Sequence, residues 1–310
     1  MIKVKYHQNI KKKYYETIAN RKMKKYKNRT FENYYNTYIK KSLANYTLKE
    51  LICGNVDKLQ EIKDTIGTKY CSKTNTIKKF FNYDKTSTSY NAKTSAFQKQ
   101  ISEFIQNNVD VHTCYYCNID FINTFKKKNA KKNAFTLDHV YEKAIYPFLS
   151  LSLYNLVPSC YTCNSKVKDS KIEFNEFIPT NKDFDFNEKV KFKSFLSSSA
   201  NIRIEKNEDF YINLIESFSN RYDKYIESLN LNDRYEYHKY RVLEMINKRK
   251  IYPDSRIKEI AALTYRTEED IKQDLFGIYL SEELNIRPFS KLTRDISKEL
   301  GLIPSRMKDD

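Results

Sequence analysis

The chain has 310 residues, 40% of them hydrophobic, and a formal net charge of +17. Its length suits one large domain or two to three small ones. No run of about 18 apolar residues occurs and the basic amino-terminal segment lacks the apolar core of a secretory signal, so we expect no membrane span and a cytoplasmic location. The charge favours a polyanionic partner such as nucleic acid, although a composition rich in Lys, Asn, Ile and Tyr produces such a charge without any functional demand.

The amino-terminal part is predicted to be mainly helical. Residues 1–30 form an arm rich in Lys, Arg and Tyr, either a basic helix or a tail that orders on a phosphate backbone. Thr47 followed by Glu50 matches a capping box, and apolar residues between 97 and 105 recur at helical spacing. The polar segment 83–95 predicts a loop before that last helix.

Four of the six cysteines form two CxxC pairs, at Cys114 and Cys117 and at Cys160 and Cys163. Two such knuckles supply the four thiolates of a tetrahedral zinc site. A site filled by four cysteines has no open position, so we predict a structural zinc ion. His112 is a less favoured substitute for one cysteine. The other two cysteines are predicted to be reduced thiols, because disulfides are rare in the cytosol.

Asp138 and His139 lie between the two knuckles, at the end of a β-prone run. A carboxylate can hold a hard divalent cation, and an imidazole can deprotonate water near neutral pH. Asn164 directly follows the last cysteine, where a short helix is predicted, and its amide oxygen is a candidate second metal ligand. Asn155 is a candidate for fixing a loop or the imidazole by hydrogen bonding. Taken alone, either asparagine fits a turn or a helix cap.

Beyond the second knuckle, residues 190–196 alternate like a β-strand, and residues 202–205 are its predicted partner. From about residue 207 onward the pattern predicts helices. Thr267 with Asp270 resembles a capping box. The first of several apolar helical stripes, which normally face a core, consists of Ile212, Leu214, Ile215 and Phe218.

The combined pattern CxxC…DH…NL…CxxCN…K resembles that of the HNH endonucleases over residues 112–170. The resemblance implies a ββα-metal fold whose ends are pinned by the zinc knuckles. Its first strand would be 134–140 and its second near 155–159, separated by the loop 141–154. The metal-binding helix would lie near 161–169.

We therefore expect an α+β chain with a small ββα-metal HNH module and a four-cysteine zinc site. The module is predicted at 111–175. A basic, mainly helical region is predicted at 1–110. A mainly helical region with a possible short hairpin is predicted at 176–310.

By the same resemblance, His139 would be the general base. Asp138 and Asn164 would hold a catalytic Mg²⁺ or Mn²⁺, and Asn155 would support the active-site loop and orient the base. The last histidine of the family pattern is replaced here by Asn164, which keeps an oxygen ligand.

Three lysines are candidates to contact nucleic acid: Lys143, Lys166 and Lys168. The family usually has a lysine three residues past Asn164, where this chain has Val167. Whether Lys166 or Lys168 meets the phosphate therefore stays open, and Lys168 is also counted among the catalytic residues.

The expected function is metal-dependent hydrolysis of DNA, double-stranded by resemblance, in a bacterial defence or restriction effector. The alternatives are a non-catalytic, zinc-stapled nucleic-acid-binding module and a homing-type endonuclease. The long flanking regions have room to bind a regulatory protein such as an ATPase, or to form a homo-oligomer. No phosphate-cradling GxxxxGK[ST] or GxGxxG motif occurs, so we expect no nucleotide-dependent chemistry in the chain itself.

Overall fold

The computed structural model describes residues 1–23, 29–72, 75–83, 97–127, 130–168, 178–197 and 203–304. The chain has the expected α+β character, with small two-stranded sheets among helices. It divides into two compact units. The amino-terminal unit comprises Lys3–Tyr115 and Ile122–Phe184, and the carboxy-terminal unit comprises Met1–Ile2, Tyr116–Phe121 and Asp185–Asp310. Each unit is described by itself.

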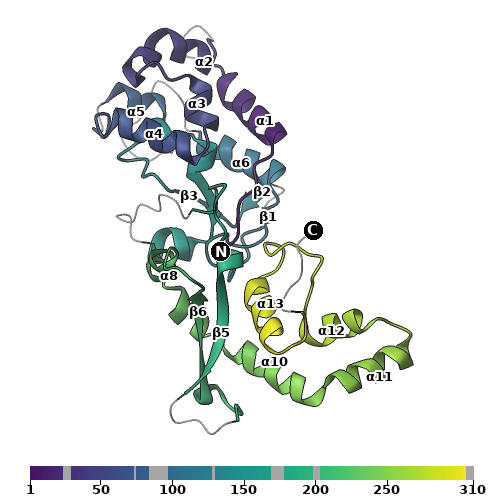
Figure 1. Cartoon of the computed structure of the whole chain (residues 1–310). Coiled ribbons are helices and arrows are strands. Elements are labelled where there is room, and N and C mark those ends of the chain that lie inside the picture. The colour runs from purple at the N-terminus through teal and green to yellow at the C-terminus, as the bar shows by residue number, and fades with distance from the viewer. Residues whose placement is uncertain are drawn as a thin grey trace. The chain divides into compact units, whose positions relative to one another are not determined.

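Helices make up the first part of the amino-terminal unit (Figure 1). They are α1 (Gln8–Ala19), α2 (Phe31–Tyr34), α3 (Leu48–Cys53), α4 (Val56–Ile66), α5 (Thr76–Phe80) and α6 (Gln98–Asn108). The predicted capping box is present at the start of α3, where Thr47 and Glu50 each bond the other's backbone N–H. The predicted loop 83–95 lies, beyond Tyr83, outside the described residues.

Two strand pairs follow α6. The first is a hairpin of β1 (Thr124–Lys127) and β2 (Ala130–Asn133), which the sequence analysis did not predict. The second joins β3 (Thr136–His139) to β4 (Leu156–Ser159) in antiparallel register, with His139 opposite Leu156. A π-helical turn, η7 (Cys163–Val167), comes next and lies against β3. Both predicted strands and the helical segment are thus present, each shorter than predicted.

The segment between β3 and β4 is buried against the helices of the same unit. It contains two 3₁₀ turns, η5 (Pro147–Leu149) and η6 (Leu153–Asn155). Ser150 donates a hydrogen bond to the Phe81 carbonyl at 2.8 Å, and Tyr14 donates one to the Leu151 carbonyl at 2.9 Å. The helices therefore fix the backbone that connects the two central strands.

The carboxy-terminal unit is built on a hairpin of β5 (Val190–Leu196) and β6 (Phe210–Glu216). Its helices are α7 (Phe186–Lys189), α8 (Asp223–Ser228), α9 (Leu231–Glu236), α10 (Tyr240–Ile251), α11 (Asp254–Thr264), α12 (Glu268–Phe276) and α13 (Ser290–Glu299). The predicted capping box of Thr267 and Asp270 begins α12. In the described part of the chain, no helix combines the length and the apolar character that crossing a membrane requires.

Two predictions for this unit were wrong. β5 pairs with β6 and not with residues 202–205, of which 203–205 form no strand and 202 lies outside the described residues. The apolar stripe that begins at Ile212 belongs to a strand and not to a helix. The buried residues of β6 are Phe210, Ile212 and Leu214, which alternate with less buried ones. A period of two places them on one face of a strand.

Candidate functional site

The four cysteines of the two knuckles come together. Their Sγ atoms lie within 4.8 Å of one another, all four residues are buried, and the group could hold a metal ion. Tetrahedral zinc, with Zn–S bonds of about 2.3 Å, keeps its sulfurs about 3.8 Å apart, which is compatible with this grouping. His112 is not part of the group, and its Nε2 lies 2.5 Å from a carboxylate oxygen of Asp110.

Backbone N–H groups point at the sulfurs. Cys160 N–H donates to Cys114 Sγ at 3.3 Å, and Cys163 N–H donates to Cys160 Sγ at 3.4 Å. Ile119 N–H donates to Cys117 Sγ at 3.4 Å. Donors aimed at sulfur stabilise the thiolate form, which is the form that binds metal. The donor set therefore fits a closed, four-sulfur metal site.

Asp138 and Lys168 form a buried ion pair beside β3. The Lys168 Nζ lies 2.5 Å from the Asp138 Oδ2, and the side chains are 6% and 7% exposed, respectively. The pair joins the penultimate residue of β3 to the residue that directly follows η7. Because it is shielded from water, the attraction is stronger than that of a surface pair.

His139 ends β3 next to this pair. Its Nε2 lies 3.0 Å from the Ser150 carbonyl oxygen. Since a carbonyl can only accept a hydrogen bond, Nε2 carries the proton and Nδ1 is the basic nitrogen of the neutral ring. Burial, reinforced by the positive charge of Lys143, lowers the pKa of His139 to about 4. The ring is therefore neutral near pH 7, as a general base requires.

Tyr83 contacts the imidazole and was missed by the sequence analysis. The two rings meet edge-to-face, with centroids 4.4 Å apart and an interplanar angle of 89°. The Lys143 Nζ lies 5.2 Å from the centroid of the same tyrosine ring. Two residues before Tyr83, the Phe81 carbonyl accepts the hydrogen bond from Ser150, the residue that orients His139. Two residues of the segment after α5 thus support the imidazole ring, Phe81 through Ser150 and Tyr83 by direct contact.

Asn155 is fully buried and bonds the loop that follows His139. Its Oδ1 accepts from the Tyr141 N–H at 2.6 Å, and its Nδ2 donates to the carbonyls of Tyr141 and Leu149 at 3.1 and 3.0 Å. Its own carbonyl accepts from the Val140 N–H at 3.1 Å. Of the two roles considered for Asn155, these contacts match the fixing of a loop.

The remaining predicted residues lie on the same unit in different surroundings. Asn164 is half-buried on η7, and its side-chain amide makes no hydrogen bond to another described residue. Lys166 is exposed, with its Nζ 5.9 Å from the centroid of the Tyr161 ring. Of the two lysines between which the sequence could not choose, Lys168 is the one beside Asp138.

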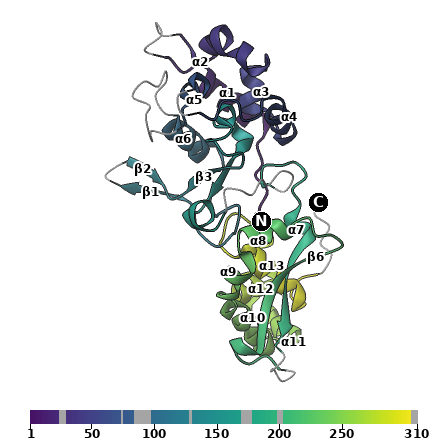
Figure 2. The same ribbon diagram turned by 90° about the vertical axis from the view of Figure 1, so that its left-hand side faces the viewer.

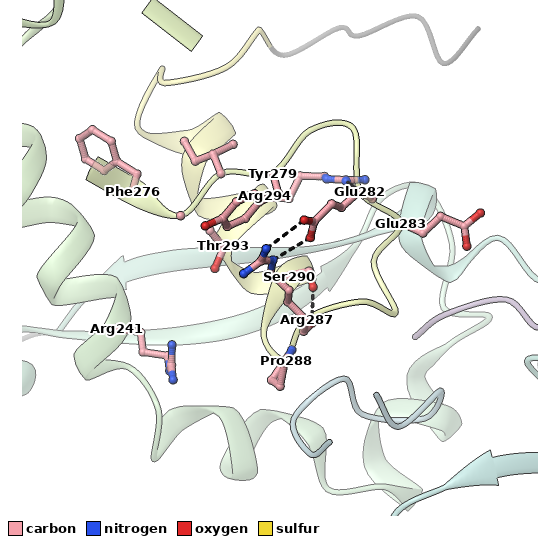
Figure 3. A pocket seen from close by; sticks show the side chains of 12 residues that line it. Arg241, Phe276, Tyr279, Glu282, Glu283, Arg287, Pro288, Ser290, Thr293 and Arg294 are labelled. Atoms are coloured by element: carbon pink, nitrogen blue, oxygen red, sulfur yellow. Dashed lines mark hydrogen bonds and ion pairs between the residues drawn. The ribbon is translucent and has the colours of Figure 1, made fainter. Parts of the chain in front are cut away.

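A separate cavity of about 180 Å³ lies in the carboxy-terminal unit (Figure 3). The Arg287 guanidinium makes two hydrogen bonds to the Glu282 carboxylate, at 2.7 and 3.0 Å, and stacks on Tyr279 with its carbon 3.7 Å from the ring centroid. Arg294 donates to the Glu282 carbonyl at 3.0 Å. Of the three arginines that line the cavity, Arg287 is thus neutralised by a carboxylate of the same cavity wall.

No protein-family model matches the chain, and searches of curated proteins and of solved structures found no similar protein.

Proposed function

We propose that the chain is a metal-dependent endonuclease of the HNH kind that hydrolyses phosphodiester bonds in DNA. The observation that carries this proposal is the buried ion pair of the Asp138 carboxylate with the Lys168 ammonium, directly followed on β3 by the neutral imidazole of His139. A base, an anionic ligand and a phosphate-seeking cation are the parts that phosphodiester hydrolysis needs.

In this proposal, Nδ1 of His139 takes a proton from the water that attacks phosphorus. Nε2 cannot do so because it already carries the proton that it donates to the Ser150 carbonyl. Asn155 fixes the backbone directly after the histidine through Tyr141, and Tyr83 limits the tilt of the ring. A base held in one orientation loses less entropy when the substrate arrives.

Asp138 and Asn164 would hold the divalent cation. The Asp138 Oδ2 already faces a positive charge, the Lys168 ammonium 2.5 Å away, so its position favours a cation. Bound Mg²⁺ or Mn²⁺ would supply positive charge against the charge that develops on the phosphate. Lys168 would then be released from the carboxylate to contact a phosphate oxygen, while Lys143 and Lys166 offer further positive charge near the site.

The four-cysteine group is proposed to hold structural zinc. Cys160 directly follows β4 and Cys163 begins η7, so the ion would fix the angle between the strand pair and the turn that carries Asn164. A zinc ion saturated with four sulfurs has no position for water or substrate.

The ion pair of Asp138 with Lys168 also favours a second candidate, a zinc-stapled nucleic-acid-binding module without catalysis. In that case Lys168 is the permanent counter-ion of Asp138 and no divalent cation enters. This candidate predicts DNA binding that weakens with salt, without cleavage in any divalent ion.

The biological context proposed is a bacterial defence or restriction effector, because Lys143, Tyr146 and Pro147 in the loop 141–147 resemble residues of HNH proteins of bacterial anti-phage systems. A regulatory protein such as an ATPase, or a second copy of the chain, would control it. Co-purification of a second protein with the chain from its native host would support control by a regulatory protein.

The test is to incubate zinc-loaded protein with supercoiled plasmid in Mg²⁺, in Mn²⁺, in Ca²⁺ and without divalent ions. We expect nicked or linear DNA only with Mg²⁺ or Mn²⁺, and product ends that a DNA ligase rejoins, because water attack that expels the 3′-oxygen leaves a 5′-phosphate and a 3′-hydroxyl. Protein that binds the plasmid and cleaves it under none of these conditions would contradict the nuclease and leave the binding module.

A further inference from the structure

The β1–β2 hairpin is a strongly basic segment of the chain. Five of the seven residues from 126 to 132 are lysines, and no acidic residue occurs between Asp120 and Asp138. The strands pair antiparallel, with Phe125 opposite Lys132 and Lys126 opposite Lys131. Two lysine positions, 126 and 131, therefore face each other across the ribbon, and no acidic position faces a lysine.

Three of the described side chains of this ribbon are open to solvent. Phe125 is 49% exposed, and Lys126 and Lys132 are both exposed. Neither lysine forms an ion pair with any carboxylate in the described part of the chain. Lysines at a strand edge also prevent aggregation, but like charges placed side by side destabilise a two-stranded ribbon. An external polyanion would remove that repulsion.

The hairpin is joined directly to the strand that carries the candidate site. The Ala134 N–H donates to the Asn123 carbonyl at 2.9 Å and closes the base of the hairpin. Only Ala134 and Phe135 separate β2 from β3, which ends at His139. In Figure 2 the ribbon of β1 and β2 extends to one side of its unit.

The short connection between β2 and β3 limits the distance between the hairpin and His139. Five residue steps of extended chain span at most roughly 17 Å, so Ala134 at the base of the hairpin lies no further than that from His139. Successive nucleotides of one DNA strand rise about 3.4 Å, so phosphates bound at the base of the hairpin would lie within about five nucleotides of the scissile bond.

We propose that the β1–β2 hairpin binds the phosphate backbone of nucleic acid beside the cleavage site. Lys126 and Lys132 contact phosphate oxygens, and the exposed ring of Phe125 lies between them and the sugar or base edges, a combination suited to nucleic acid. The place of the hairpin relative to a scissile bond rests on the proposed function, whereas its binding of phosphates is measurable without any cleavage.

The test compares K126Q/K132Q with wild type in binding a fluorescent DNA duplex across a salt series. Ca²⁺ replaces Mg²⁺ so that binding is read without cutting. Each lysine that neutralises a phosphate contributes about 0.9 to the slope of log affinity against log salt concentration. We expect the slope of the variant to be less steep by about 2 and its affinity to fall about tenfold.

The matched control is K224Q/K258Q, which removes two exposed lysines from α8 and α11 of the other unit. It changes net charge equally and should bind like wild type. Equal melting temperatures of all three proteins verify that the hairpin substitutions leave the fold intact.

An unchanged slope in K126Q/K132Q, an equal loss in the control, or wild-type protein that binds only an acidic protein and no DNA would each overturn the hairpin proposal. Plasmid cleavage separates it from the proposed nuclease. If wild type binds DNA through the hairpin lysines but never cleaves, the hairpin proposal stands and the nuclease fails. If wild type cleaves while the variant binds with the wild-type slope, only the hairpin proposal fails.

Discussion

The ammonium group of Lys168 lies 2.5 Å from the carboxylate of Asp138, and both side chains are nearly buried. A lysine at the end of η7 thus neutralises a carboxylate on β3, so the pair is an electrostatic link between the two elements. Removing one partner leaves an uncompensated charge away from water, which costs far more than the loss of a surface pair.

Replacing Lys168 with Met should lower the free energy of unfolding by about 3–5 kcal/mol, because Asp138 stays buried without its cation. Urea unfolding of zinc-loaded protein measures the change. Arg266→Met is the control: its partner Asp274 is 54% exposed, so the loss should be much smaller than that of Lys168→Met. The double variant D138N/K168M should recover part of the stability. Equal small losses for both single variants would refute this account of the pair.

Replacing Asn155 with Ala should free the loop after His139. The Tyr141 N–H loses its acceptor and two carbonyls lose a donor, at about 1–3 kcal/mol for each buried group left unsatisfied. Hydrogen exchange of the Tyr141 amide should accelerate. Asn164→Ala should leave that exchange unchanged, since the Asn164 side chain has no hydrogen bond to the loop. A Tyr141 amide that stays protected in the Asn155 variant would show that other contacts hold the loop.

Replacing Cys163 with Ser should abolish tight zinc binding, because one of the four sulfurs is lost. Elemental analysis of purified wild-type protein should give about one zinc per chain. Cys71→Ser is the control, since Cys71 is exposed and is not part of the group, and this variant should keep its zinc. If the Cys163 variant retains as much zinc as wild type, the metal is held elsewhere.

Lowering the pH should destabilise the chain partly through His139. Its pKa is about 4 in the folded chain and 6.5 when unperturbed, so between these values the unfolded state binds more protons than the folded state. The contribution of His139 to stability is therefore present above pH 6.5 and is lost as the pH falls toward 4. Thermal melting at stepped pH should show a shallower loss for His139→Gln than for wild type. Parallel curves would mean that the folded and unfolded pKa values are alike.

Local signals in the sequence predicted local structure well. The capping boxes at Thr47 and Thr267 involve residues three apart, so no distant contact is needed to recognise them. The knuckle spacing likewise predicted the gathering of the four cysteines, because metal chemistry limits how two CxxC pairs can be used.

Long-range pairing could not be predicted in the same way. The partner of β5 was misassigned because the apolar residues from 210 to 218 fit both a helical and a strand period over part of their length. The β1–β2 hairpin was missed because its lysines carry no apolar alternation. Tyr83 carries no local sign of its contact with His139, which arises only when the helical region packs on the loop between β3 and β4.

The most direct test of the central claim is plasmid cleavage in Mg²⁺ or Mn²⁺ by His139→Ala beside His238→Ala. His238 is a matched control, because burial also lowers its pKa but it lies on the carboxy-terminal unit. General-base catalysis typically contributes 10²- to 10⁴-fold to rate, so the account predicts a loss of about that size for His139→Ala and wild-type cleavage for His238→Ala. Cleavage by His139→Ala at the wild-type rate would contradict the assignment of His139 as the base.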